Sequence, residues 1–154
     1  MKIKIVDLKK ERSHRKTFPR SIRLKSVKDI EALFRHRFFL KSGNFRLYYL
    51  RQDLTSSKER IQFLVSVSKK NFQLAVDRNQ IKRWIREAIR LEKFFLEEYL
   101  SVLNNRYIFA VTYLGNRKPD AAKARKEVHQ LFQQWIQLDE KNKTNSDSST
   151  SSID

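Results

Sequence analysis

The stretch DRNQIKRWIREAIR, residues 77–90, places five basic residues among isoleucine, tryptophan and alanine. Successive residues of an α-helix are rotated by about 100°, so a helix through this stretch separates two kinds of side chain. The basic residues gather on one face, which holds Arg78, Lys82, Arg86, Arg90 and Lys93, with Arg83 beside them. The apolar residues gather almost opposite, and they are Ile81, Trp84, Ile85, Ala88, Leu91 and Phe95. The spacing predicts a long helix with its apolar face in the core.

The basic face of this helix indicates a polyanionic partner. Charged helix faces are usually only solvated, but a surface adapted for solubility mixes both signs. Here Glu87 and Glu92 lie off the basic face, and like charges four residues apart destabilise an isolated helix by roughly a few tenths of a kcal/mol per pair. Asp77 followed by Gln80 predicts a capped helix start, where free N–H groups would add to an anion-binding end.

Charge and composition narrow the classes of protein. The chain has 154 residues, enough for one domain, and 34 Lys and Arg against 17 Asp and Glu give a net charge of +17. A nucleic acid would offset this charge. No apolar run is long enough for a secretion signal or a membrane span, so we expect a cytoplasmic protein without a membrane partner. The absence of Cys excludes disulfides and thiolate metal sites, and nothing indicates protein oligomerisation.

Composition divides the chain into three regions. Residues 1–20 are rich in Lys and Arg and lack a sustained apolar period, which predicts a flexible basic N-terminal arm. Residues 139–154 are polar and rich in Ser and Thr, which predicts a disordered tail. Residues 21–138, between them, are expected to form the folded domain.

The first half of this domain predicts a helix followed by strands. Ser26 and Asp29 have the spacing of a capping box, and apolar residues at helical spacing follow them. Residues 44–50 and 61–68 alternate apolar and polar side chains, which predicts two strands that pair antiparallel across a polar loop. Residues 38–40 are a candidate for a further short strand.

The second half predicts the basic helix, a buried strand and a last helix. Residues 108–111 are all apolar and Gly115 follows, which is typical of a buried strand. After Pro119, apolar residues recur at helical spacing and predict a helix, namely Ala121, Ala124, Val128, Leu131, Trp135 and Leu138. Trp84 and Trp135 are expected to be packing residues. The fold class is therefore α+β, a single-domain α/β sandwich with too few strands for a doubly wound sheet.

Three ordered motifs of this chain resemble the protein subunit family of bacterial ribonuclease P. They are SVSKK at residues 66–70, AVDRN at residues 75–79 and IKRWIREAIR at residues 81–90. A looser resemblance runs from Leu24 to about Leu138. The resemblance implies a left-handed crossover between parallel strands around the basic helix.

The resemblance also implies two kinds of RNA-binding residue. Family members bind the catalytic RNA through the basic helix, for which the candidates are Arg78, Asn79, Lys82, Arg83, Arg86 and Arg90. They hold the single-stranded 5′ leader of precursor tRNA in a cleft between the first helix and the sheet, for which the candidates are Phe34, Phe38, Phe45, Tyr48, Lys69 and Lys70. The chain departs from the family pattern at Gln80, where a second motif Arg is usual, and at Arg37, near an expected Gly.

The chemistry implied by the resemblance belongs to RNA. In ribonuclease P the RNA subunit, with Mg²⁺, removes the 5′ leader, so the implied partners are the RNA subunit and precursor tRNA, and no cofactor is expected on the protein alone. The sequence independently offers no catalytic group and no metal site. His14, His36 and His129 are scattered, and no paired carboxylates have a metal-ligand spacing.

Two other interpretations stay open on charge alone. A non-enzymatic RNA-binding or ribosomal protein of similar fold would bind RNA without regard to a 5′ leader. A DNA-binding module would place the basic helix in a major groove, but the predicted neighbours include no second helix to position it.

Overall fold

The computed structural model describes residues 18–53, 59–101 and 105–151, so residues 1–17 of the predicted basic arm lie outside the described part. The elements follow one another in the order η1 (Arg20–Ile22), α2 (Val27–His36), β1 (Phe39–Ser42), β2 (Phe45–Asp53), β3 (Ile61–Val67), α3 (Ala75–Leu100), β4 (Asn105–Tyr113) and α4 (Ala121–Ser151). This order confirms the predicted α+β class and the short additional strand, which is β1.

The four strands form one sheet in the order β1-β2-β4-β3. β2 is antiparallel to β4, and β3 is parallel to it. The prediction that β2 and β3 pair with each other was therefore wrong, because β4 lies between them. Residues 108–111 of β4 have no exposed surface, and a strand that is apolar on both faces is best buried at the centre of a sheet covered on both sides. The parallel β3–α3–β4 unit confirms a crossover through α3, and its left-handed sense stays a prediction.

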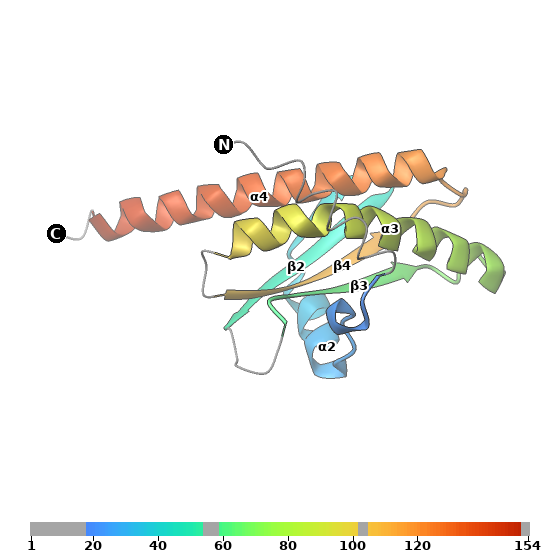
Figure 1. Cartoon of the computed structure of the whole chain (residues 1–154), viewed down its shortest axis with the longest axis horizontal. Coiled ribbons are helices and arrows are strands. Elements are labelled where there is room, and N and C mark those ends of the chain that lie inside the picture. The colour runs from blue at the N-terminus through green and yellow to red at the C-terminus, as the bar shows by residue number, and fades with distance from the viewer. Residues whose placement is uncertain (1–17, 54–58, 102–104, 152–154) are drawn as a thin grey trace, which may run out of the picture.

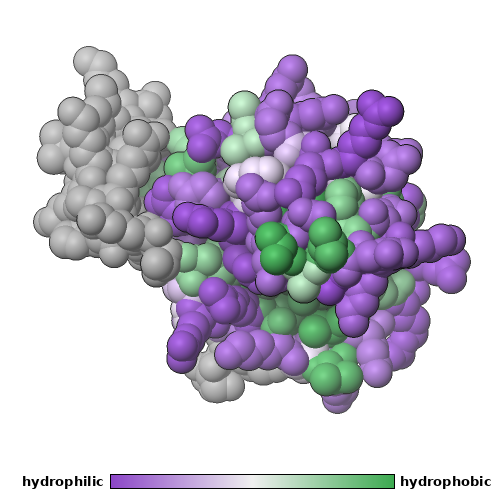
Figure 2. Space-filling view, turned by 90° about the vertical axis from the view of Figure 1, so that its right-hand side faces the viewer, coloured by the Kyte–Doolittle hydropathy of each residue, from purple (hydrophilic) through white to green (hydrophobic). Residues whose placement is uncertain are grey.

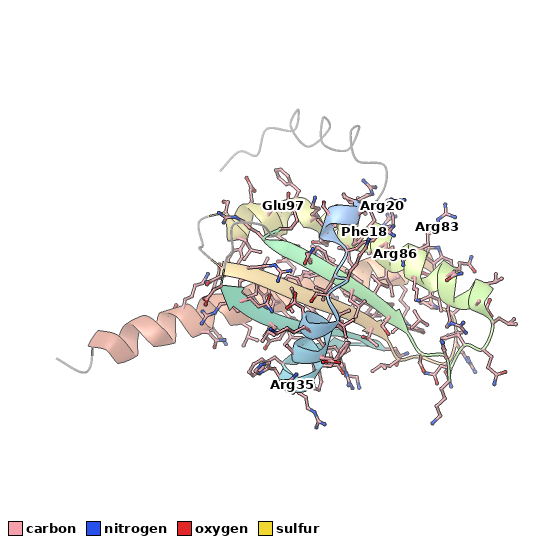
Figure 3. The ribbon with its side chains drawn as sticks, turned by 90° about the horizontal axis from the view of Figure 1, so that it is seen from below. Phe18, Arg20, Arg35, Arg83, Arg86 and Glu97 are labelled. Atoms are coloured by element: carbon pink, nitrogen blue, oxygen red, sulfur yellow. The ribbon has the colours of Figure 1, made fainter. Side chains whose placement is uncertain are left out.

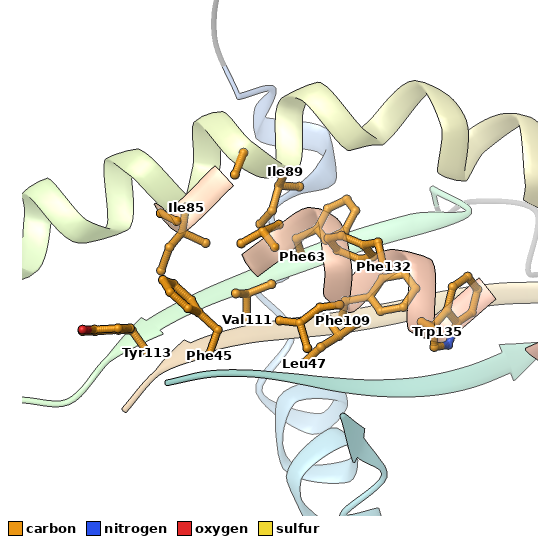
Figure 4. Close-up of a cluster of buried hydrophobic side chains, with 14 of the residues drawn as sticks. Phe45, Leu47, Phe63, Ile85, Ile89, Phe109, Val111, Tyr113, Phe132 and Trp135 are labelled. Atoms are coloured by element: carbon orange, nitrogen blue, oxygen red, sulfur yellow. The ribbon is translucent and has the colours of Figure 1, made fainter. Parts of the chain in front are cut away.

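Helices cover both faces of the sheet (Figure 1). α3 and α4 lie on one face, where the larger core cluster joins the sheet residues Phe63 and Phe109 to Ile89, Phe132 and Trp135 of the two helices (Figure 4). α2 lies on the other face. A smaller cluster there contains the buried residues Leu24, Leu33, Ile108 and Ala110. The domain is thus a three-layer arrangement of helices, sheet and one short helix.

α3 begins two residues earlier than the predicted cap at Asp77. Leu74 is its N-cap and makes no side-chain capping bond. Asp77 lies in the first turn, where a negative charge interacts favourably with the helix dipole. Lys118 binds it with an Nζ–Oδ1 distance of 2.7 Å and also donates to Gln80 Oε1 at 2.7 Å. The helix start is therefore held by Lys118, and the predicted cap was wrong.

The buried face of α3 lies closer to the basic residues than the helical wheel predicts. Ile81, Ile85 and Ile89 are fully buried, whereas Phe95, predicted to face the core, is 42% exposed. Trp84 packs against the core but is only partly buried. Lys93 is only 7% exposed and its ammonium lies 3.1 Å from Glu97 Oε1, so it does not extend the basic face. The buried arc is centred on Ile85 and Ile89 because these residues reach the sheet.

α4 continues to Ser151, although a disordered tail was predicted from residue 139. Asp139 Oδ2 accepts a hydrogen bond of 2.6 Å from the phenol of Tyr99, and Asp139 Oδ1 accepts one of 2.9 Å from Tyr107. Lys143, one turn further, lies 3.0 Å from the same carboxylate. The first turns of this segment are held by polar contacts to Tyr99 and Tyr107, and the domain boundary at residue 138 stays a prediction.

Candidate RNA-binding surfaces

The first candidate surface is formed by cations on α3 and η1, at the β3 edge of the sheet. Arg83 and Arg86 of α3 lie on the same side of the molecule as Arg20 of η1 (Figure 3). Lys82 is half-buried beside them, and Arg23 approaches Arg86 closely enough to act on its charge. We call Arg20, Arg23, Lys82, Arg83 and Arg86 the α3 basic surface.

Electrostatics make the α3 basic surface an anion-binding candidate. Partial burial, and in second place the positive charge of Arg23, lower the pKa of the Arg86 guanidinium. Within the described residues, neither Lys82 nor Arg86 forms a salt bridge with a carboxylate. A partly buried guanidinium that is also repelled by a neighbouring positive charge is costly without an anion beside it. A phosphate backbone would relieve that cost.

Two of the residues predicted to bind the RNA subunit have intramolecular partners. Arg78 donates to the carbonyl oxygens of Phe72 at 2.7 Å and Gln73 at 2.9 Å, so it holds the loop before α3. Arg90 donates to Glu87 at 3.0 Å, and this bond is the main reason that the pKa of Arg90 is raised. Asn79 is exposed in the first turns of α3.

Arg20 and Arg23 were missed as site residues by the sequence analysis. They line a cleft of about 1000 Å³ between η1 and the end of α3, together with Lys25 and Arg60. The chain there forms a short helix and a parallel bridge from Arg23 to Phe63 of β3. The sequence signal for these two residues was the group of basic residues between 20 and 25. The predicted flexible arm ended at residue 20 and so included the first of them.

The second candidate surface is an aromatic cluster on the α2 face of the sheet. Phe34 of α2 meets Tyr48 of β2 edge to face, with ring centroids 4.8 Å apart. Phe39 of β1 lies 5.5 Å from Tyr48. The guanidinium of Arg46 lies 4.4 Å from the centre of the Phe39 ring and donates to Tyr48 Oη at 3.1 Å. We call Phe34, Phe39, Arg46 and Tyr48 the α2 aromatic cluster.

The α2 aromatic cluster contains only two of the four predicted aromatic residues. Phe45 is 1% exposed and packs on Tyr113 in the other core, so the prediction that it lines the leader cleft was wrong. Phe38 stacks on Tyr49, which packs against the same core. Alternation along β2 is the reason, because side chains an odd number of residues apart point to opposite faces. Strand periodicity could have separated Phe45 from Tyr48.

Lys69 and Lys70 lie in the turn between β3 and α3, and both side chains are exposed. Figure 2 views this end of the molecule, where hydrophilic side chains cover most of the surface around a few hydrophobic ones. The turn is anchored by Asn71, whose Nδ2 donates to the Leu114 carbonyl at 3.1 Å. The two lysines are available to an anion, and their part in binding a leader stays a prediction.

A buried polar network holds α2 against the sheet. Ser26 caps the helix by accepting a bond of 3.3 Å from Asp29 N–H, which confirms the predicted cap. The Asp29 carboxylate lies 3.6 Å from Arg106 Nη1 and accepts from Gln52 at 3.1 Å. Arg106, a buried residue of β4, also donates to Gln52 and Gln62. These bonds set the position of α2, which forms one wall of the aromatic cluster.

Metal ligation and membrane insertion find no support in the described residues. No group of three or more His, Asp or Glu side chains in that part of the chain could hold a metal ion. Among the helices described, none has the length and apolar content needed to cross a bilayer.

Comparisons with known proteins agree in one family. The model of the family described as Ribonuclease P matches residues 18–135. The ribonuclease P protein component of Chlorobium phaeobacteroides is 36% identical over 112 residues, which cover 67% of this chain and 77% of that protein. The one from Nitrosomonas eutropha is 38% identical over 77 residues, covering 50% and 62%. The Staphylococcus aureus RNase P protein structure has a TM-score of 0.56 at 20% identity, covers 74% and 94%, and shares the fold.

Proposed function

The chain belongs to the ribonuclease P protein family, and we propose that it binds the catalytic RNA subunit and the 5′ leader of precursor tRNA. The observation that carries the proposal is the α3 basic surface, where the positive charge of Arg23 acts on the partly buried Arg86 and no carboxylate of the described residues forms a salt bridge to Arg86. Arginine forms bidentate bonds to phosphate, so this surface suits the backbone of a folded RNA.

The leader would bind on the other side of the sheet. A single strand exposes its bases, which stack on aromatic rings, while cations meet its phosphates. The α2 aromatic cluster offers both, since Phe34, Phe39 and Tyr48 supply aromatic rings and the guanidinium of Arg46 lies over the rings of Phe39 and Tyr48. The protein would thus hold the RNA subunit on one surface and the substrate on another.

Hydrolysis itself would be carried by the RNA subunit with Mg²⁺, and the protein would position the substrate. Catalytic phosphodiester hydrolysis needs an activated water and charge stabilisation at the leaving oxygen, which RNA-bound Mg²⁺ supplies. The side chains of this chain would orient the leader and neutralise phosphates. The product would be the mature 5′ end of tRNA, formed in the cytoplasm.

Reconstitution with the RNA subunit tests this function. We expect the protein to raise cleavage of precursor tRNA at low Mg²⁺ and to make the holoenzyme bind precursor more tightly than mature tRNA. Phe34→Ala should reduce that difference, because it removes a stacking surface. Binding that ignores the leader would instead favour a non-enzymatic RNA-binding protein of the same fold, and no gain in cleavage would contradict the proposal.

A further inference from the structure

Two adjacent aromatic residues are exposed at the β1 edge of the sheet. Phe38 is 51% exposed and Phe39 is 43% exposed. Phe39 contacts Tyr48 on the α2 face, whereas Phe38 stacks on Tyr49 with ring centroids 6.0 Å apart and an angle of 22°. Tyr49 packs against the core beneath α3 and α4. Exposed aromatic rings are therefore presented on both faces of the same edge.

The backbone at Arg37 brings a third ring to this edge. Arg37 has φ 54° and ψ 29°, a left-handed conformation that is unfavourable for a residue with a side chain. The turn places the His36 ring parallel to Phe38, with centroids 6.0 Å apart and an angle of 9°. Arg37 is the C-cap of α2, and its left-handed conformation ends the helix and turns the chain toward β1. We call His36, Phe38 and Tyr49 the edge stack.

The edge stack borders a cleft between the sheet and α4. The cleft has a volume of about 740 Å³, and Phe38, Tyr49, Trp135 and Leu138 form its apolar part. Arg51 lies in the same lining, and Arg35 and Arg37 are exposed on the neighbouring end of α2. An apolar, aromatic surface with arginines around it matches a nucleotide, which has a flat base and an anionic phosphate.

We propose that the edge stack binds an unpaired base from the distal part of the 5′ leader, upstream of the nucleotides held at the α2 aromatic cluster. This inference rests on the proposed function. The leader is favoured over other occupants because Phe39, which contacts Tyr48 in the α2 aromatic cluster, directly follows Phe38 in the chain, and Phe38 is exposed at the same edge of the sheet and stacks on Tyr49. A strand leaving the α2 face at β1 meets Phe38 next, with Arg37 beside it.

The test uses the holoenzyme and a series of precursor tRNAs that differ only in leader length. In the wild-type protein, affinity should rise as the leader grows, with a last increment when it reaches the edge stack. Phe38→Ala should remove only that last increment, an affinity loss of about fivefold or more for one stacked base. Precursors with short leaders should bind the variant as tightly as they bind the wild type.

Two further substitutions at the same position separate stacking from general apolar contact. Phe38→Tyr keeps the ring and should retain the long-leader increment, whereas Phe38→Leu keeps an apolar side chain and should lose it. Phe95→Ala is the matched control, because Phe95 is also an exposed phenylalanine but lies on α3. A leader carrying 2-aminopurine at successive positions should show stacking-dependent quenching at one distal position, absent in Phe38→Ala.

Several outcomes would overturn the inference. One is an equal loss of affinity for short and long leaders in Phe38→Ala, and another is full retention of the last increment in Phe38→Leu. Self-association of the wild type that Phe38→Ala abolishes would assign the surface to a second copy of the chain. Failure of the proposed function is recognised separately, since the wild-type holoenzyme would then show no dependence on the leader at any length.

Discussion

The guanidinium of Arg78 donates a hydrogen bond of 2.7 Å to the carbonyl oxygen of Phe72. This bond closes the turn that connects β3 to α3 and ties it to the first turns of the basic helix. An arginine that a sequence pattern assigns to RNA binding therefore also has an intramolecular role. Substitutions along α3 should divide into those that change the fold and those that change only RNA binding.

Arg78→Ala should lower the stability of the folded domain. The substitution leaves the carbonyl oxygens of Phe72 and Gln73 without their donor, and we expect a loss of about 1–3 kcal/mol. Arg83→Ala, on an exposed side chain of the same helix, should change stability by less than about 0.5 kcal/mol. Thermal unfolding of the two variants measures the difference. Equal unfolding midpoints for Arg78→Ala and Arg83→Ala would show that the hydrogen bonds of Arg78 do not stabilise the fold.

Arg86→Ala should weaken the binding of the RNA subunit and make it less sensitive to salt. Each phosphate that the protein no longer neutralises lowers the slope of log K against log salt by about 0.7–0.9. Lys126→Ala is a suitable control, because Lys126 is an exposed cation on α4 and is not part of the α3 basic surface. If Arg86→Ala and Lys126→Ala have the same slope as the wild type, Arg86 does not contact phosphate.

Glu87→Gln should raise RNA affinity. The carboxylate of Glu87 binds Arg90 across one turn of α3, and the hydrogen bond from Arg90 is the main reason that the pKa of Glu87 is lowered. Removing this charge takes away the ion pair of Glu87 with Arg90 and reduces the repulsion between α3 and a phosphate. We expect RNA affinity to rise about two- to fivefold at low salt. Titration of the RNA subunit at two salt concentrations measures it, and the gain should shrink at high salt. Weaker binding of Glu87→Gln would contradict the prediction.

Asp139 should make the stability of the C-terminal helix depend on acid pH. Burial acts to raise the pKa of Asp139, but the hydrogen bonds from Tyr99, Lys143 and Tyr107 together bring it below the ordinary value. A lowered pKa in the folded state stabilises the fold above the unfolded pKa, about 3.9, and this contribution disappears as pH falls through the folded value.

Asp139→Asn removes the titrating group at this position. We expect the variant to be less stable than the wild type at neutral pH and to approach it below about pH 3. Urea unfolding at both pH values checks the sign. A stability difference that does not change with pH would show that the carboxylate charge of Asp139 contributes nothing.

Arg106→Ala should destabilise the domain strongly. It leaves the mostly buried carboxylate of Asp29 without its cation and removes donors to Gln52 and Gln62, for an expected loss of about 3–5 kcal/mol. Asp29 sits in the first turn of α2, so leader affinity should fall as the helix loses its position. The combined variant Arg106→Met with Asp29→Leu should recover part of the stability, and no recovery would contradict a charge-pair origin.

Local periodicity was sufficient to predict most elements from the sequence. The apolar spacing in α2, α3 and α4 identified these helices, because a helix must bury one face whatever it packs against. Ser26 as a cap and the long apolar run of β4 were likewise local signals. Helical spacing also predicted that basic residues share one side of α3. The three ordered motifs indicated the family.

Tertiary structure decided how those elements and side chains are used. β4 separates β2 from β3 because it is apolar on both faces, a consequence of pairing between segments far apart in sequence. Arg78 and Lys93 have intramolecular partners, so they do not belong to the α3 basic surface. Phe45 packs on Tyr113 because of its place along β2, and Phe38, directly before β1, stacks on Tyr49. Sequence periodicity determines which side chains share a face, but only the packing of distant segments determines what that face meets.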